Sequence, residues 1–135
     1  MSFTVEKYPD LPVVIITLNE DFNLAAELDA FGQEVMAALD ALDEPVYTIS
    51  DASRMRNTFS EMVGSLAAVT RGNFVSLLKH PMVMKMLVVD HRDLTRLAVN
   101  ALGQAQYGGF SVAIFRSVDD ALEDIRAAVS ETAGS

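Results

Sequence analysis

The sequence contains no cysteine, which excludes disulfide bonds and metal sites built on thiolate ligands. It also lacks a long hydrophobic run. The longest apolar stretches, such as PVVII and MLVV, fall far short of the roughly 20 residues that a membrane-spanning helix needs. The first ten residues, MSFTVEKYPD, have neither the basic nor the apolar segment of a signal peptide. We therefore expect a cytoplasmic protein without a membrane span.

The motifs of common catalytic sites are missing as well. There is no G-x-S-x-G nucleophile elbow, no G-x-G-x-x-G and no P-loop. The two histidines, His80 and His91, have no second histidine four residues away, and a zinc site needs three or four ligands. Acidic pairs such as Asp119-Asp120 fall in the first turn of a predicted helix, where the helix dipole favours negative charge. We therefore expect no enzyme, no metal and no cofactor.

The charge of the chain is large and unevenly spread. The net charge is −9, with 11 acidic and 1 basic residue in 1–53, 3 and 8 in 54–116, and 5 and 1 in 117–135. Overall acidity disfavours a duplex-DNA binder, and the basic middle third has few interleaved aromatic residues for a single-stranded partner. We expect no nucleic acid. The basic third leaves room for an anion or an acidic protein, or it only solvates one face of the domain.

Five segments have the composition of strands. FTVEKY (3–8) alternates like an edge strand, and VVIITL (13–18) is a nearly continuous apolar run typical of a buried strand. The PDLP turn between them predicts an antiparallel hairpin. Three more strands are predicted, VYTIS (46–50), MLVVD (86–90) and SVAIF (111–115).

Apolar residues at helical spacing separate these strands. Asn23 is the predicted cap of a first helix that Pro45 stops, with an apolar stripe of Leu24, Leu28, Phe31, Val35, Leu39 and Leu42. Thr58 with Glu61, and then Asp93, mark two further helix starts. Ser117, with Asp120 three residues later, caps a last helix. We expect one domain over residues 1–131 and a frayed tail at 132–135.

The resulting order is β-β-α-β-α-β-α-β-α, which predicts an α/β fold with a mostly parallel five-stranded sheet and about four helices. The strands at 13–16 and 87–89 are apolar on both faces, so both faces of the sheet should be covered. If all helices wind onto one face, the other face is a candidate dimer surface. We expect a homodimer.

This element order, on a chain this short, resembles the STAS-like fold of anti-sigma-factor antagonists, also called SpoIIAA-like. The resemblance rests on VYTISDASRM as strand plus loop, LLKHPMVMKMLVVD as strand entry, and SVAIFRSVDDALEDIR as strand plus last helix. In regulatory members a serine in an Asp-Ser-Ser-Gly-like loop after the third strand is phosphorylated by a partner kinase. This chain has Asp51-Ala52-Ser53-Arg54, without the glycine, and Ser53 holds the comparable place.

Two interpretations of the loop after the third strand stay open. Parallel sheets place sites at the carboxyl ends of their strands, so the loop can be a recognition edge for a protein partner, formed by Asp51, Ser53, Arg54, Arg56 and Thr58. Alternatively, Asp51 and the serines only bond to nearby backbone N–H groups and turn the chain.

A second functional hypothesis comes from three alternating methionines, Met82, Met84 and Met86, which we predict on the face opposite Val83, Lys85 and Leu87. Methionine adapts to irregular apolar ligands, although it more often fills a core. The fold also resembles CRAL-TRIO lipid-binding domains. A pocket for a small apolar ligand or lipid would then be lined by Phe59, Phe74, Met82, Met84 and Met86. Our first expectation remains a non-enzymatic regulatory or protein-interaction domain, and the alternative is a lipid carrier.

Overall fold

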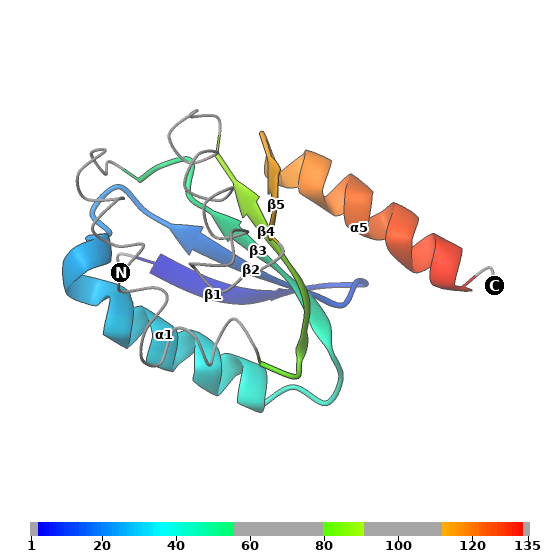
Figure 1. The fold of residues 1–135 in the computed structure, drawn as a ribbon, viewed down its shortest axis with the longest axis horizontal. Helices are drawn as coiled ribbons and strands as arrows, with labels where there is room; N and C mark the ends of the chain where they lie inside the picture. Colours follow the sequence, from blue (N-terminus) through cyan, green and yellow to red (C-terminus); the bar gives the residue numbers. More distant parts are fainter. Residues whose placement is uncertain (1–2, 56–79, 91–111, 134–135) are drawn as a thin grey trace, which may run out of the picture.

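A computed structural model of the chain describes residues 3–55, 80–90 and 112–133 (Figure 1). Within them the elements are β1 (Phe3–Tyr8), β2 (Val13–Leu18), α1 (Leu24–Asp40), β3 (Val46–Asp51), β4 (Val83–Val89), β5 (Val112–Phe115) and α5 (Val118–Ala133). The helix starts predicted at Thr58 and Asp93 lie outside the described residues. Helix α5 continues to Ala133, two residues into the predicted tail.

The five strands form one mixed sheet in the order β1-β2-β3-β4-β5. Strands β1 and β2 are antiparallel, and every other neighbouring pair is parallel. The hairpin turn places Asp10 at φ 69°, in the left-handed region, and the Lys7 ammonium closes it by donating to the Leu11 carbonyl at 2.6 Å. The predicted α/β class, the antiparallel hairpin and the mostly parallel sheet are confirmed.

Helix α1 begins where the sequence predicts it. The Asn23 side chain accepts the Ala26 N–H at 3.1 Å, and the Glu27 carboxylate accepts the Asn23 N–H at 2.6 Å. The side chain and the backbone N–H of the cap residue are therefore both hydrogen-bonded. The helix ends at Asp40, however, and not at Pro45. A bond from Leu42 N–H to the Leu39 carbonyl tightens the last turn, and Leu42 packs at the rim of the core from beyond the helix.

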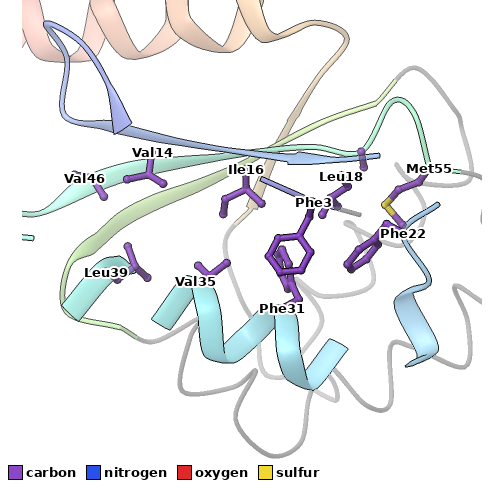
Figure 2. Close-up of a cluster of buried hydrophobic side chains, with 11 residues drawn as sticks. Phe3, Val14, Ile16, Leu18, Phe22, Phe31, Val35, Leu39, Val46 and Met55 are labelled. Carbon is purple, nitrogen blue, oxygen red and sulfur yellow. The ribbon is translucent and has the colours of Figure 1, made fainter. Parts of the chain in front are cut away.

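One face of the sheet packs on α1 (Figure 2). The apolar residues of the helix that face the sheet are Phe31, Val35 and Leu39, and they meet side chains of the first three strands and the loops beside them, namely Phe3, Val14, Ile16, Leu18, Phe22, Val46, Ala52 and Met55. Three phenylalanines, Phe3, Phe22 and Phe31, contact one another edge to face, with ring centroids 5.3–5.9 Å apart. This cluster fixes the hairpin and its following loop to the helix.

The opposite face of the sheet packs on α5. Ala121, Leu122 and Ile125 bury against Val13, Ile49, Leu87 and Val89. The helix is capped as predicted, because the Ser117 hydroxyl accepts the Asp120 N–H at 3.1 Å. The two described helices therefore lie on opposite faces of the sheet, as the two-sided apolar strands require (Figure 1). The homodimer predicted for a bare face stays a prediction.

Strand β4 differs from its predicted form. It begins at Val83, three residues before the predicted start, and a register shift opposite Val46 and Tyr47 interrupts its pairing with β3. Val83 consequently packs in the cluster on α1, whereas Leu87 belongs to the cluster on α5. The prediction that Val83 and Leu87 share a face is wrong, because one extra residue at a bulge reverses the alternation of a strand.

Thr48 carries a buried hydroxyl without a hydrogen-bond partner, in the centre of β3. Its side chain is 1% exposed, so the hydroxyl has lost its water without gaining a protein acceptor. Replacing it with the isosteric methyl group removes that cost. We expect Thr48→Val to raise the free energy of unfolding by about 1 kcal/mol in urea denaturation. The matched change Thr4→Val, on the exposed side of β1, should alter it by less than about 0.5 kcal/mol. Equal effects at the two positions would contradict the explanation.

Candidate functional site

Strands β2 to β5 run in the same direction, so their carboxyl ends meet at one edge of the sheet. At this edge Asp51 ends β3 and is paired with Val89 of β4. Asp90 follows Val89, and its backbone N–H donates to the Phe115 carbonyl at the end of β5 at 3.0 Å. Two aspartates on adjacent central strands therefore stand at the edge where parallel sheets place their sites.

The loop of residues 51–55 has a defined shape. The Asp51 carboxylate oxygen Oδ1 accepts both the Ser53 N–H at 3.1 Å and the Ser53 hydroxyl at 2.6 Å. Ala52 donates its N–H to the Val89 carbonyl at 2.8 Å, and Met55 donates its N–H to the Ala52 carbonyl at 3.1 Å. Ala52 and Met55 are buried in the core on α1. Two buried residues thus anchor a short loop in the core, and the exposed Arg54 lies between them.

This geometry bears on the two interpretations of the loop that the sequence left open. Asp51 does bond to local backbone and turns the chain, as the structural interpretation requires. The same turn leaves Ser53 half-buried beside an exposed Arg54. Asp51, Ser53 and Arg54 are therefore brought together. Arg56 and Thr58, the other two residues predicted for this recognition edge, lie outside the described residues, and the role of all five stays a prediction.

Asp90 is 2% exposed, and no motif in the sequence marks it as a site residue. Burial of a carboxylate is costly unless hydrogen bonds or opposite charge compensate it. A buried aspartate at a strand end is therefore expected to have a structural or functional role. A signal for it was present: the runs VYTISD and MLVVD both end in aspartate, and parallel pairing of those two strands puts their ends side by side.

In chemical terms the loop offers a hydroxyl oriented by a carboxylate and an adjacent guanidinium. A hydrogen bond from Ser53 to a charged acceptor holds the hydroxyl in one rotamer. The exposed Arg54 can form bidentate hydrogen bonds with a carboxylate or phosphate. Across residues 3–55, 80–90 and 112–133, no three side chains of His, Asp or Glu are grouped as a metal site would need.

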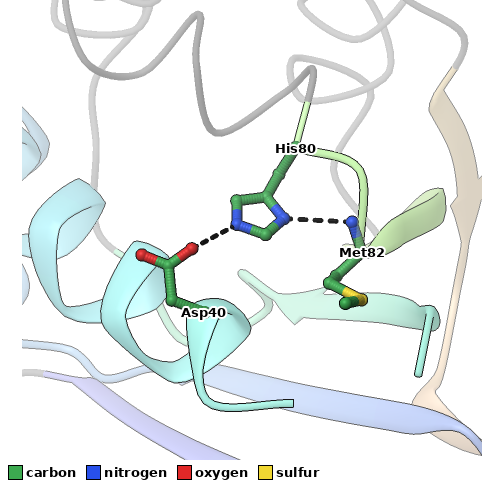
Figure 3. A network of polar contacts seen from close by, with 3 residues as sticks. All are labelled: Asp40, His80 and Met82. Carbon is green, nitrogen blue, oxygen red and sulfur yellow. Dashed lines mark hydrogen bonds and ion pairs between the residues drawn. The ribbon is translucent and has the colours of Figure 1, made fainter. Parts of the chain in front are cut away.

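A second polar network ties the other end of β4 to α1 (Figure 3). His80 Nε2 lies 2.7 Å from Asp40 Oδ1, and His80 Nδ1 accepts the Met82 N–H at 3.0 Å. Because Nδ1 accepts a hydrogen bond, the ring is the neutral tautomer with its proton on Nε2, donated to Asp40. The Met82 carbonyl in turn accepts the Val46 N–H at 2.7 Å, so His80 joins the end of α1 to the first pairing of β3 with β4.

The methionines predicted to line a ligand pocket do not share one environment. Met82 is half-buried in the turn that His80 supports, Met84 is 49% exposed, and Met86 is half-buried opposite Thr48. Phe59 and Phe74 lie outside the described residues. The ligand pocket therefore stays a prediction that no described contact favours.

The fold, but not the sequence, matches known proteins. No family model matches the chain, and no curated protein matches it. Among solved structures, the chain is similar to an uncharacterised protein of the DUF3478 family with a SpoIIAA-like fold from Shewanella loihica PV-4, with TM-score 0.58, 11% identity, and 91% of each chain covered. It is also similar to an anti-sigma factor antagonist from Mycobacterium paratuberculosis, with TM-score 0.56, 20% identity, 93% of this chain covered and 95% of that one.

These similarities show that the chain has a SpoIIAA-like, STAS-like fold, as its resemblance to that family implied.

Neither described helix has the combination of length and apolar character that crossing a bilayer demands.

The Asp51 carboxylate accepts the N–H two residues ahead, an arrangement called an Asx turn. Removing this acceptor should affect the loop. Asp51→Ala leaves the Ser53 N–H and hydroxyl without Oδ1, and the loop should open locally. We expect the Ser53 amide to exchange with solvent about tenfold faster by NMR hydrogen exchange. Asp51→Asn keeps a carbonyl oxygen in the same place and serves as the control, with exchange close to that of the wild type. If the two variants exchange alike, the turn does not depend on this acceptor.

The His80 network predicts a graded loss of stability. His80→Ala removes the acceptor of the Met82 N–H and the donor to Asp40, and should lower the free energy of unfolding by about 1–3 kcal/mol. His80→Asn can still accept the N–H two residues ahead in an Asx turn, so it should recover part of that loss. Urea denaturation of the two variants measures the difference. An asparagine variant no more stable than the alanine variant would show that the bond to Met82 contributes nothing.

Proposed function

We propose that the protein is a non-enzymatic regulatory module that binds a protein partner through the loop of residues 51–55. The observation that carries the proposal is the construction of this loop. Buried Ala52 and Met55 hold it in the core, while Ser53 is half-buried and Arg54 is exposed at the carboxyl edge of the sheet. A preformed loop loses little conformational entropy when it binds, which favours recognition of a partner.

The similarity to an anti-sigma factor antagonist supports a role in protein binding. Two described features agree with this role. Arg54 is the kind of side chain that dominates protein interfaces, because its guanidinium makes several directed hydrogen bonds. The loop is also fixed to the end of β4, because the Ala52 N–H donates to the Val89 carbonyl, so a partner at this edge meets a preformed loop.

Ser53 gives the same loop a means of regulation. A phosphate on Ser53 would carry nearly two negative charges and would remove the hydroxyl proton that Asp51 now accepts. Repulsion from Asp51 would then oppose the present turn, and Arg54 is the nearest cation in sequence that can compensate it. A modified loop would therefore present a different shape and charge to the partner.

The lipid-carrier alternative receives no specific support from the described contacts, since Met82, Met84 and Met86 differ in exposure. The interaction role is therefore the function that the geometry supports best.

The proposal is tested by quantitative affinity capture from cells of the natural host with the full chain as bait. Arg54→Glu should reduce recovery of the specific partner about tenfold, because reversing a central interface charge costs roughly the energy of a hot-spot contact. Ser53→Glu, which adds charge next to Asp51, should also reduce it. Arg126→Glu on α5 makes the same charge change at an exposed site away from the loop and should leave recovery unchanged.

Any protein captured equally by the wild type and by Arg54→Glu is not recognised by this loop. If every captured protein behaves in that way, the loop is not the contact and the proposed function is wrong. Circular dichroism of each variant establishes that the bait is folded, so a loss of capture cannot come from unfolding.

A further inference from the structure

Strand β1 forms one edge of the sheet, and no described strand lies on its outer side. Thr4, Glu6 and Lys7 of this strand are exposed. The segments outside the described residues that join strands run from β3 to β4 and from β4 to β5, so they begin and end at strands two to four positions away from β1. This edge is therefore where another strand can extend the sheet.

The backbone groups that face this edge follow from the pairing of β2. The Tyr47 N–H donates to the Pro12 carbonyl, so the backbone groups of Pro12 face β3 and those of the next residue, Val13, face β1. Val13 is paired with Tyr8, so Tyr8 and the other even-numbered residues of β1 turn their backbone groups towards β2. The N–H and C=O groups of the remaining residues face outward, and these residues are Phe3, Val5 and Lys7.

The edge lacks the features that natural proteins use to block pairing. Its register with β2 is unbroken from Phe3 to Tyr8, whereas the register of β4 shifts, and no proline lies within it. Its one lysine, Lys7, is bent back to the hairpin turn, where the ammonium donates to the Tyr8 carbonyl at 3.0 Å and to the Leu11 carbonyl at 2.6 Å. The edge is thus a regular strand of 6 residues.

A two-fold axis perpendicular to the sheet places a second copy of β1 antiparallel to the first, with the same face of both sheets on one side. If Glu6 or Lys7 lies on that axis, two like charges stand directly opposite each other, which is unfavourable. If Thr4 lies on it, only residues 3–5 overlap. With Val5 on the axis, residues 3–7 of the two copies pair, and no like charges are opposed.

We propose that two copies of the chain join through this edge, β1 against β1, with Val5 on the two-fold axis. The two Val5 residues exchange a pair of N–H···O=C hydrogen bonds, and Phe3 of each copy does the same with Lys7 of the other. The two sheets of five strands become one continuous sheet.

The side chains on both faces agree with this pairing. Val5 is half-buried at the rim of the cluster on α1, so two valines in contact across the axis continue that cluster from one copy into the other. On the opposite face the exposed Thr4 of each copy lies across from the exposed Glu6 of the other. The edge is complementary to itself, which favours a second copy over an unrelated strand.

The net charge of −9 acts against this association, because the two copies repel each other. Salt screens that repulsion. We therefore expect the dimer to become stronger as salt is added at low ionic strength, which is the opposite of an interface held by ion pairs.

The proposal does not rest on the function proposed for the loop of residues 51–55. That loop follows β3, which is two strands away from β1. Arg54→Glu should therefore dimerise like the wild type, and failure of one proposal leaves the other in place.

The chain has no cysteine, so single introduced cysteines report the register. Across the axis the Cα atoms of Val5→Cys are about 5.5 Å apart, which a disulfide spans, whereas those of Thr4→Cys are about 8 Å apart, which it does not. After mild oxidation, Val5→Cys should form a covalent dimer on a non-reducing gel, and the more exposed Thr4→Cys should form about tenfold less. Combining Thr4→Cys with Glu6→Cys should restore the covalent dimer.

A charge exchange at Thr4 supplies a second measurement, the dimer dissociation constant from sedimentation equilibrium. Thr4→Lys places a cation opposite Glu6 of the other copy and should tighten the dimer about threefold, whereas Thr4→Glu should weaken it about threefold. The matched control is Asp119→Asn at the exposed start of α5, which changes the net charge as much as Thr4→Lys and should leave the constant close to that of the wild type.

Three results would overturn the proposal. These are a monomer at every protein and salt concentration, equal covalent dimer from Thr4→Cys and Val5→Cys, or a shift in the same direction for Thr4→Lys and Thr4→Glu. Circular dichroism establishes that each variant is folded. The variants of Thr4, an exposed side chain, keep the proposal testable if Val5→Cys does not fold.

Discussion

The whole architecture depends on the burial of β3 between two parallel neighbours. Ile49 and Val46 of this strand are fully buried, one in the cluster on α5 and the other in the cluster on α1. A strand that is covered on both faces and paired on both edges has no exposed backbone, so it organises the sheet and forces a helix onto each side. The cost of this position is visible at Thr48, whose hydroxyl the tight packing leaves without an acceptor.

Both ends of β3 are fixed by polar contacts that the apolar pattern does not supply. At its start, the Val46 N–H bonds to Met82, which His80 holds against the end of α1. At its end, Asp51 turns the chain and Ala52 returns to the core. The start of β3 is joined to α1 and β4, whereas its end leads into half-buried Ser53 and exposed Arg54. The same strand thus connects a structural network to the surface that we propose for recognition.

The acidic residues of α1 are not explained by its packing on the sheet. The apolar stripe of α1 is satisfied by the sheet, and its acidic residues are not needed for that packing. Uncompensated acid at a helix carboxyl end is unfavourable for the isolated helix, and so is a glycine in its middle. Proteins depart from local rules mainly where function requires it.

The sequence by itself determined which of the described segments are strands or helices, and the caps of α1 and α5. Period-two and helical spacings of apolar residues, with Asn23 and Ser117 at helix starts, follow from local sterics and hydrogen bonding, and these hold regardless of distant contacts. Only the tertiary structure decided the bulge in β4, the partner of His80 and the nearness of Asp90 to the loop. The bulge and the partner of His80 depend on pairing between residues that are 35 or more positions apart in the chain. The nearness of Asp90 to the loop depends on the order of the strands. No local pattern encodes either.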